Sequence, residues 1–212
     1  MYLYSRRVRL TRGRARDAME WSTQICDLVN KGTDLDMSLY GQVFGRDVGT
    51  VAWTCTVDDL TQIEAASDKL MVDDAFAAAI ERGAEFQTDG PHDSLIQILH
   101  GEPDPTRHVE YVTIVHSVCA IGGFQKGVEL GIQIAQKSTE LGGQQTSFGM
   151  HTTGPYGGVA WITTAPSLAE LQEAEAKVNG DPAFIQLVDG GAPGAYTGDA
   201  WATHQRMYRK IH

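Results

Sequence analysis

Cysteine and proline are scarce in this chain of 212 residues, and acidic residues outnumber basic ones. The three cysteines, Cys26, Cys55 and Cys119, stand far apart, so the sequence contains neither a CxxC pair nor a disulfide framework. A net charge of −10 disfavours general nucleic-acid binding, which needs a cationic face. No apolar run approaches the roughly 18 residues of a membrane span, and the N-terminal segment has no apolar signal core. We therefore expect a cytoplasmic globular protein with reduced thiols.

The sequence motifs of several enzyme classes are also missing. There is no HExxH, no GxSxG and no GxGxxG, and the glycine pair Gly122-Gly123 lacks the Lys-Ser/Thr ending of a phosphate loop. No cluster of cysteine and histidine has the spacing of metal ligands. We expect neither a metal ion nor a tightly bound cofactor, and haem is the alternative.

What the chain does contain is an internal repeat with an offset of 108 residues. Between positions 41 and 84, 14 of 44 positions are identical to those of the second copy, where chance gives about 3. The repeats are 1–102 and 107–212, and the polar segment between them contains two prolines. The clearest matches are Gly49–Trp53 with Gly157–Trp161, and Asp73–Phe76 with Asp181–Phe184.

Each repeat has the same predicted order of elements, β-α-β-β-α-β, which is the ferredoxin-like α+β unit. One such unit leaves a sheet face uncovered, so we expect the two sheets to face each other in a pseudo-dimeric barrel with the helices outside. The first repeat is predicted as strand 2–10, helix 14–31, strands 37–43 and 49–57, helix 60–82 with a break at 73–74, and strand 94–100. The second is predicted as strand 109–118, helix 123–140, strands 146–153 and 157–164, helix 167–189 and strand 199–208.

One segment of each repeat carries a family resemblance. In the first repeat, Gly49, Val51, Trp53, Leu60, Glu64, Leu70, Asp73 and Phe76 resemble the strand-to-helix segment of NIPSNAP-like proteins. Ser167-Leu168 and Asp181–Phe184 of the second repeat match the last part of that pattern better. More broadly, the chain resembles the dimeric α+β barrel superfamily in a tandem form. The resemblance implies fold and not chemistry, because the motif residues are structural. The superfamily includes cofactor-independent oxygenases, haem-binding and haem-degrading proteins, and lactone or polyketide isomerases and cyclases.

Differences between the repeats identify candidate functional residues. At the offset of 108, polar residues of the second repeat replace apolar residues of the first: Val43 becomes His151, Val48 becomes Tyr156, Ile96 becomes His204 and Ile98 becomes Arg206. At the same offset Val8 becomes His116, and an alignment of the first strands that differs by one residue is the alternative. His204 and Arg206 alternate along one strand, so they share a sheet face. We predict a single pocket, walled mainly by the second repeat. Its polar end would hold His151, His204, Tyr156 and Arg206, with His116 nearby and Trp161 in the wall.

The same residues have purely structural explanations. In the expected strand order 4-1-3-2, His116 and His204 lie on neighbouring strands, whereas His151 lies two strands from His116, at about 10 Å. One tetrahedral zinc then does not easily bind all three. Partly buried histidines with ordinary hydrogen bonds, a core role for Trp161, and a last strand that faces solvent would account for these residues without a pocket.

Three functions are consistent with these observations. The first is a cofactor-independent enzyme of oxygenase, isomerase or cyclase type that acts on a small aromatic or polyketide-like compound, with histidine, arginine and tyrosine as acid–base and oxyanion groups. The second is a non-enzymatic, NIPSNAP-like or stress-response protein that binds a small hydrophobic ligand. The third is haem binding through one of the histidines. We expect a small-molecule partner, no nucleic acid, no membrane, and a homodimer, since closed two-fold dimers are the commonest soluble oligomers.

Overall fold

The computed structural model describes residues 1–45, 47–199 and 202–212, and these residues form two compact units. Unit 1 comprises Met1–Leu95 and Tyr208–His212, and unit 2 comprises Ile96–Met207. These bounds differ from those of the sequence repeats because the last strand of each repeat has residues in both units. Arg46, between the predicted strands 37–43 and 49–57, and positions 200–201 of the predicted last strand lie outside the described residues.

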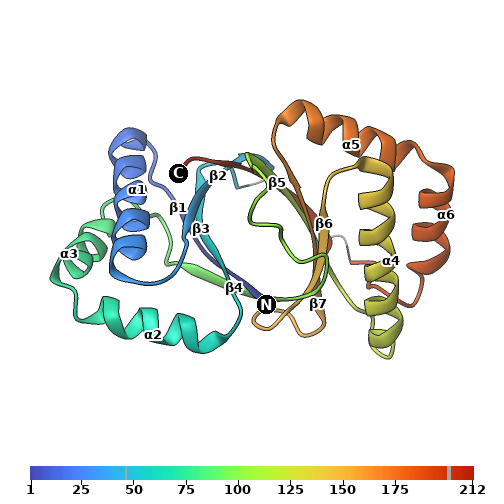
Figure 1. Cartoon of the computed structure of the whole chain (residues 1–212), viewed down its shortest axis with the longest axis horizontal. Helices are drawn as coiled ribbons and strands as arrows, with labels where there is room; N and C mark the ends of the chain where they lie inside the picture. The colour runs from blue at the N-terminus through green and yellow to red at the C-terminus, as the bar shows by residue number, and fades with distance from the viewer. Residues whose placement is uncertain (46, 200–201) are drawn as a thin grey trace. The chain divides into compact units, whose positions relative to one another are not determined.

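Unit 1 is an antiparallel sheet with helices on one face (Figure 1). Its elements are β1 (Tyr2–Arg9), α1 (Ala15–Gly32), β2 (Ser38–Phe44), β3 (Thr50–Val57), α2 (Leu60–Met71), α3 (Asp74–Gly83), the first residues of β4 (His92–His100) and the last of β8 (His204–Lys210). Strand β3 lies between β1 and β2, and the end of the chain continues the sheet beyond β2. There the amide of Ile211 donates to the carbonyl of Leu39 at 2.8 Å, and the amide of Leu39 donates to that of His212 at 2.9 Å.

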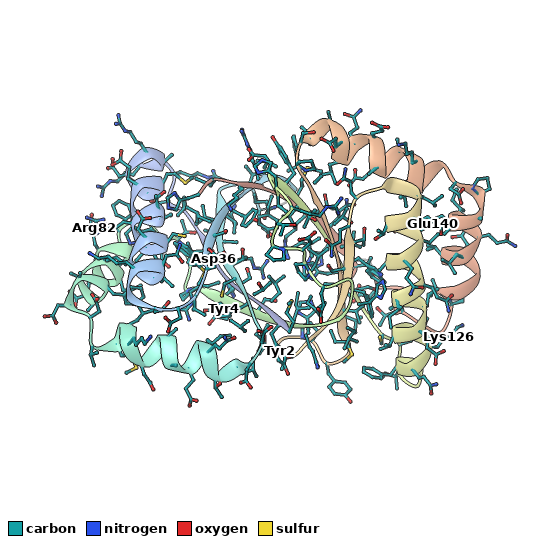
Figure 2. All side chains as sticks on the ribbon, viewed as in Figure 1. Tyr2, Tyr4, Asp36, Arg82, Lys126 and Glu140 are labelled. Carbon is teal, nitrogen blue, oxygen red and sulfur yellow. The ribbon has the colours of Figure 1, made fainter. Side chains whose placement is uncertain are left out.

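The core of unit 1 contains two tryptophans between sheet and helices. The indole of Trp53 on β3 donates to the carbonyl of Ser22 on α1 at 2.9 Å, and the indole of Trp21 donates to Ala79 on α3 at 2.8 Å. The two rings meet edge to face with their centroids 5.5 Å apart. Trp53 is therefore a core residue that uses its one donor, as a buried indole requires. Arg82, which Figure 2 places on α3, donates to the Gln24 side chain of α1 and joins the two helices.

Acidic caps set the helix boundaries in both units. Asp59 and Gln62 form a capping box at the start of α2, and Asp73 accepts a bond from the amide of Phe76 at 2.8 Å to start α3. The break predicted at 73–74 is therefore confirmed. In unit 2, Asp181 accepts from the amide of Phe184 at 2.7 Å and starts a separate helix. The single helix predicted over 167–189 is wrong there, although the repeat already aligned Asp181 with Asp73.

Unit 2 repeats the arrangement with its own sheet and helices. Its elements are β5 (Tyr111–Val118), α4 (Phe124–Gly142), β6 (Thr146–His151), β7 (Gly158–Ala165), α5 (Leu168–Gly180), α6 (Pro182–Gly191), the last residues of β4 and the first of β8. The strand order is β8-β5-β7-β6-β4, which contains the predicted order 4-1-3-2. Lys126 and Glu140 mark the two ends of α4 in Figure 2, and the Lys126 ammonium donates to the carbonyl of Pro193 at 2.7 Å.

The predicted fold class is confirmed. Both halves of the chain follow the order β-α-β-β-α-β with antiparallel strands and helices on one sheet face, as an α+β fold requires. Alternation along each strand therefore divides the side chains of unit 2 between a face toward the helices and a face away from them. Within the described residues, no helix combines the length and the apolar character needed to cross a membrane.

Candidate functional site

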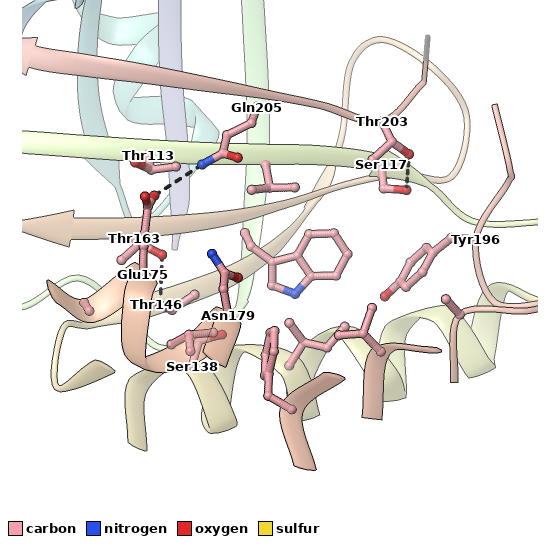
Figure 3. Close-up of a pocket in the computed structure, with 18 of the residues that line it drawn as sticks. Thr113, Ser117, Ser138, Thr146, Thr163, Glu175, Asn179, Tyr196, Thr203 and Gln205 are labelled. Atoms are coloured by element: carbon pink, nitrogen blue, oxygen red, sulfur yellow. Dashed lines mark hydrogen bonds between the residues drawn. The ribbon is translucent and has the colours of Figure 1, made fainter. Parts of the chain in front are cut away.

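A cavity of about 420 Å³ lies in unit 2, between the helix-facing side of the sheet and helices α4, α5 and α6 (Figure 3). Apolar side chains form most of its wall, and hydroxyl and amide groups gather at its ends. Cavities of about 300–1,000 Å³ with apolar walls and a few placed polar groups are typical of small-molecule sites. This cavity is therefore the candidate site of the chain.

Trp161 forms part of the cavity wall and is held rigidly. Its indole donates to the carbonyl of Gly131 on α4 at 2.9 Å, and its ring packs on Phe148 with centroids 5.4 Å apart. Tyr196 meets the same indole edge to face at 5.3 Å, and its hydroxyl donates to the carbonyl of Gly127. Burial raises the pKa of Tyr196 above its usual value, so this phenol stays protonated at neutral pH. Trp161 is thus both a core residue and a wall residue.

Three threonines form a row across three neighbouring strands at one end of the cavity. Thr113 on β5 lies directly opposite Thr163 on β7, and Thr163 lies opposite Thr146 on β6. The hydroxyls of Thr146 and Thr163 are hydrogen-bonded at 3.0 Å. At the same end, the Gln205 amide donates to the Glu175 carboxylate at 3.3 Å, and Figure 3 shows both beside Thr113. This end thus offers several hydrogen-bonding groups to a molecule in the cavity.

The other end of the cavity is also polar but is closed on itself. Ser117 of β5 and Thr203 share a hydrogen bond between their hydroxyls at 3.1 Å, and Tyr196 lies beside them in Figure 3. Because these groups already have partners within the protein, they offer less to a ligand than Thr113 does, whose hydroxyl has no partner among the described residues.

Unit 1 fills the corresponding positions with large or apolar side chains. Tyr2 pairs with Val57 in β1 and β3, while Tyr111 pairs with Ala165 in β5 and β7. Since Val57 corresponds to Ala165, the first strands match at an offset of 109 and not 108. Thr113, Ser117 and Thr163 therefore correspond to Tyr4, Val8 and Cys55, all of which belong to the hydrophobic core of unit 1 or pack against it.

This register corrects two of the sequence-based alignments. His116 corresponds to Arg7 and not to Val8, because His116 lies opposite Ala160 and Arg7 lies opposite Ala52. His151 corresponds to Gln42 and not to Val43, since Phe148 and Leu39 face the equivalent tryptophans. The alignment over 41–84 was right from β3 onward, but a one-residue difference in the preceding connection shifts everything before it. The polarity change at these two histidines is therefore smaller than predicted.

The structure brings three of the predicted residues together on the sheet face away from the helices. His116 Nδ1 lies 3.1 Å from His151 Nε2, and the rings of His116 and His204 stack with centroids 4.7 Å apart. The two residues lie two strands apart, as predicted, but their side chains reach across β7, so the backbone spacing of about 10 Å does not separate the imidazoles. The strand between them carries Ala160 opposite both His116 and Gly149, so no bulky side chain separates the two imidazoles.

The other three predicted residues do not join this group of histidines. Trp161 follows Ala160 on β7 and points to the opposite face, into the cavity. Arg206 lies two residues after His204 on β8 and shares its sheet face. It is half-buried and does not belong to the cavity lining. Tyr156 is 96% exposed on the connection between β6 and β7. The groups that sequence reasoning missed are Glu175 and the threonine row, and only a correct register would have shown three threonines side by side.

The three cysteines are buried, and burial disfavours their thiolate forms. Desolvation raises the pKa of Cys26 and of Cys55 to about 11, and it also raises the pKa of Cys119. All three are free thiols. Among the residues described, no group of three or more histidine, cysteine, aspartate or glutamate side chains is arranged to hold a metal ion.

Comparison with known proteins places the chain by its fold. No family model matches it, and no curated protein does. Among solved structures, a candidate monooxygenase of Fusobacterium nucleatum matches 100% of this chain and 92% of its own, with a TM-score of 0.73 and 7% identity. An anthrone oxidase-like protein matches 100% of this chain and 91% of its own, with a TM-score of 0.68 and 10% identity. A haem-degrading enzyme of Listeria monocytogenes matches 100% of both chains, with a TM-score of 0.53 and 8% identity.

The chain has the dimeric α+β barrel fold. The likeness extends over the whole chain in each case, so the resemblance predicted from the two repeats is confirmed at the level of the fold. Identities of 7–10% carry no chemistry from these proteins to this one.

One of these fold neighbours is a haem-degrading enzyme. The residues that line the cavity of unit 2 do not fit a haem group. The described lining contains no histidine, cysteine or methionine that would bind an iron. The one phenol, Tyr196, already donates its hydroxyl to Gly127. The haem hypothesis therefore finds no support in this cavity.

Proposed function

We propose that unit 2 binds one small, largely apolar molecule of aromatic or polyketide-like type in the cavity between its sheet and helices α4–α6. The cavity itself carries this proposal, because its volume and its apolar wall suit such a ligand. The comparison between the units supports it. Packing constrains both sheets in the same way, yet the positions of Tyr4 and Cys55 are threonines in unit 2.

An aromatic ligand is favoured by the shape and chemistry of the wall. The Trp161 indole and the Phe184 ring both line the cavity, and aromatic rings gain about 0.5–1.5 kcal/mol from stacked or edge-to-face contacts beyond the area they bury. The fold neighbour described as anthrone oxidase-like is consistent with a ligand of fused rings.

Binding is tested by calorimetry on the purified chain with 2-methylnaphthalene and anthrone as probes. We expect one site per chain and quenching of tryptophan fluorescence. In Trp161→Phe, which keeps an aromatic wall, binding should persist while much of the quenching is lost. Absence of heat and quenching up to the solubility limit of both probes would contradict the proposal.

A second candidate function is oxygenation of the bound aromatic compound, favoured by the neighbours described as a candidate monooxygenase and as anthrone oxidase-like. For anthrone the balanced reaction consumes one O₂. The ring methylene loses two hydrogens and becomes a ketone, one oxygen atom enters that ketone, and the other leaves as water. Glu175, the carboxylate in the cavity lining, is the group placed to accept the first proton.

Oxygenation is measured with an oxygen electrode and by the absorbance of anthraquinone. We expect uptake above the uncatalysed rate, and Glu175→Gln should lower the rate at saturating anthrone while anthrone still binds. If the chain binds anthrone but never accelerates its oxidation, the binding function stands alone.

A further inference from the structure

The hydroxyl of Thr113 has no partner within the described part of the protein, although it is buried. Thr113 is 4% exposed, its Oγ1 is shielded from solvent, and it lines the cavity of unit 2. A buried polar group without a partner costs about 1–3 kcal/mol. Native proteins rarely keep such a group without a reason. An unpartnered hydroxyl on a residue of the cavity wall indicates that a molecule in the cavity completes its bond.

The neighbouring groups define what that molecule can present. Thr163 lies opposite Thr113 on the next strand and already shares its hydroxyl bond with Thr146. Gln205 is exposed and holds the half-buried Glu175 at this same end (Figure 3). An O–H group placed here would accept from Thr113 and donate to the carboxylate of Glu175. Each bond would be of ordinary strength, and the one to the carboxylate would be the stronger.

The charge of the lining separates ligand classes. Among the lining residues that the structure describes, Glu175 is the one acidic side chain, and neither lysine nor arginine is present. A carboxylate or phosphate at this end would meet a like charge without a compensating cation. An uncharged hydroxyl meets no such penalty.

Resting on the proposed function, we infer that the ligand is an uncharged hydroxyarene whose O–H group is held between Thr113 and Glu175 while its ring lies against Trp161. Thr113 and Glu175 are thus the specificity-determining residues of the cavity, and they select a hydroxyl over a methyl group and over a carboxylate.

The test compares three probes of one ring system by calorimetry: 2-naphthol, 2-methylnaphthalene and 2-naphthoate. We expect 2-naphthol to bind about tenfold more tightly than the other two. Thr113→Val, which keeps the shape and removes the hydroxyl, should weaken 2-naphthol about five- to tenfold and leave 2-methylnaphthalene unchanged. Thr113→Ser keeps the hydroxyl and should retain most of the affinity. Glu175→Gln should tighten the binding of 2-naphthoate.

The controls keep this inference separate from the proposed function. Thr164 follows Thr163 on β7 and points to the other sheet face. Thr164→Val should therefore leave the affinity for all three probes unchanged. If 2-naphthol and 2-methylnaphthalene bind equally, or if Thr113→Val leaves 2-naphthol unaffected, the inference is overturned while binding itself stands. A water molecule would then be the partner of Thr113. If none of the three probes binds, the proposed function fails and the inference fails with it.

Discussion

The indole nitrogen of Trp161 donates to the carbonyl oxygen of Gly131, 2.9 Å away, at the point where β7 meets helix α4. Trp53 makes the equivalent bond to Ser22 in unit 1, also at 2.9 Å. The residue on the helix differs because of what packs against it. A Cβ on Gly131 would lie 2.3 Å from the ring of Phe148, which is fully buried.

We therefore expect Gly131→Ala to destabilise the chain. Alanine favours the helix by up to about 1 kcal/mol, but the clash with Phe148 costs about 1–3 kcal/mol, so a net loss should remain. Gly190→Ala in α6 is the matched control, because its Cβ would meet no atom within 4 Å. It should be neutral or slightly stabilising. Urea unfolding measures both, and equal stabilities for the two variants would contradict the packing at Gly131.

The filled core of unit 1 predicts how to close the cavity of unit 2. Thr113→Tyr places in unit 2 the residue that occupies the same position of unit 1, Tyr4. We expect the variant to fold, because the cavity of about 420 Å³ has room for the ring, and to bind 2-methylnaphthalene at least tenfold more weakly. Tyr4→Phe, a change in unit 1, should leave the affinity unchanged. Tight binding to the Thr113→Tyr variant would place the ligand elsewhere.

The helix cap at Asp181 gives a third prediction. Asp181 starts α6 by accepting a bond from the amide of Phe184. Asp181→Ala should lower the free energy of unfolding by about 1 kcal/mol, while Asp181→Asn should retain most of it. Asp189→Ala, near the end of the same helix, removes an unfavourable interaction with the helix dipole and should cost nothing. Thermal unfolding of the three variants in one buffer provides the comparison.

Periodicity and the repeat were sufficient to predict the strand order and the helix-covered face of each unit. They failed to predict the register of the first two strands, where a shift of one residue changes the sheet face of a side chain. The identities at Val51, Ala52 and Trp53 fix an offset of 108 for β3, and nothing in the sequence showed that β1 and β2 follow an offset of 109. That single shift moves each compared residue to the other sheet face.

The threonine row and Glu175 were not predicted from the sequence. Histidine attracts attention in a sequence because it titrates near neutral pH. Threonine does not, since it is common in any strand. Thr113, Thr163 and Thr146 become a binding surface only through their register across three strands, and Glu175 joins them only through helix packing. Both are tertiary properties that local patterns do not contain.

The buried thiols predict a loss of stability in alkali. The pKa of Cys26 and of Cys55 is raised to about 11 in the folded chain, from 9.0 for an unperturbed thiol. The stabilisation from burying the neutral thiols is complete below pH 9 and is lost as the pH rises through 11. Each thiol should contribute up to about 1.4 kcal/mol per pH unit across that window.

Urea unfolding at pH 8.0 and 10.5 measures the alkaline loss. The double variant Cys26→Ala, Cys55→Ala should be less stable at pH 8.0 and should lose less between the two pH values. At pH 8.0 the native chain should react with a thiol reagent far more slowly than the unfolded chain does. Rapid labelling of both thiols in the native chain would contradict their burial.

A site on one or the other face of the unit 2 sheet leads to different predictions for variants of His204 and Arg206. If the cavity is the binding site, His204→Ala and Arg206→Ala should bind 2-naphthol within about twofold of the original chain, because both side chains lie on the other face. The catalytic roles predicted from the sequence for His151, His204, Arg206 and Tyr156 require instead that anthrone oxidation falls sharply in these variants. Calorimetry and oxygen uptake on the same preparations separate the two. Unchanged binding with lost turnover would move the chemistry to the face where His116 contacts His151, and unchanged values of both would leave Glu175 as the acid–base group.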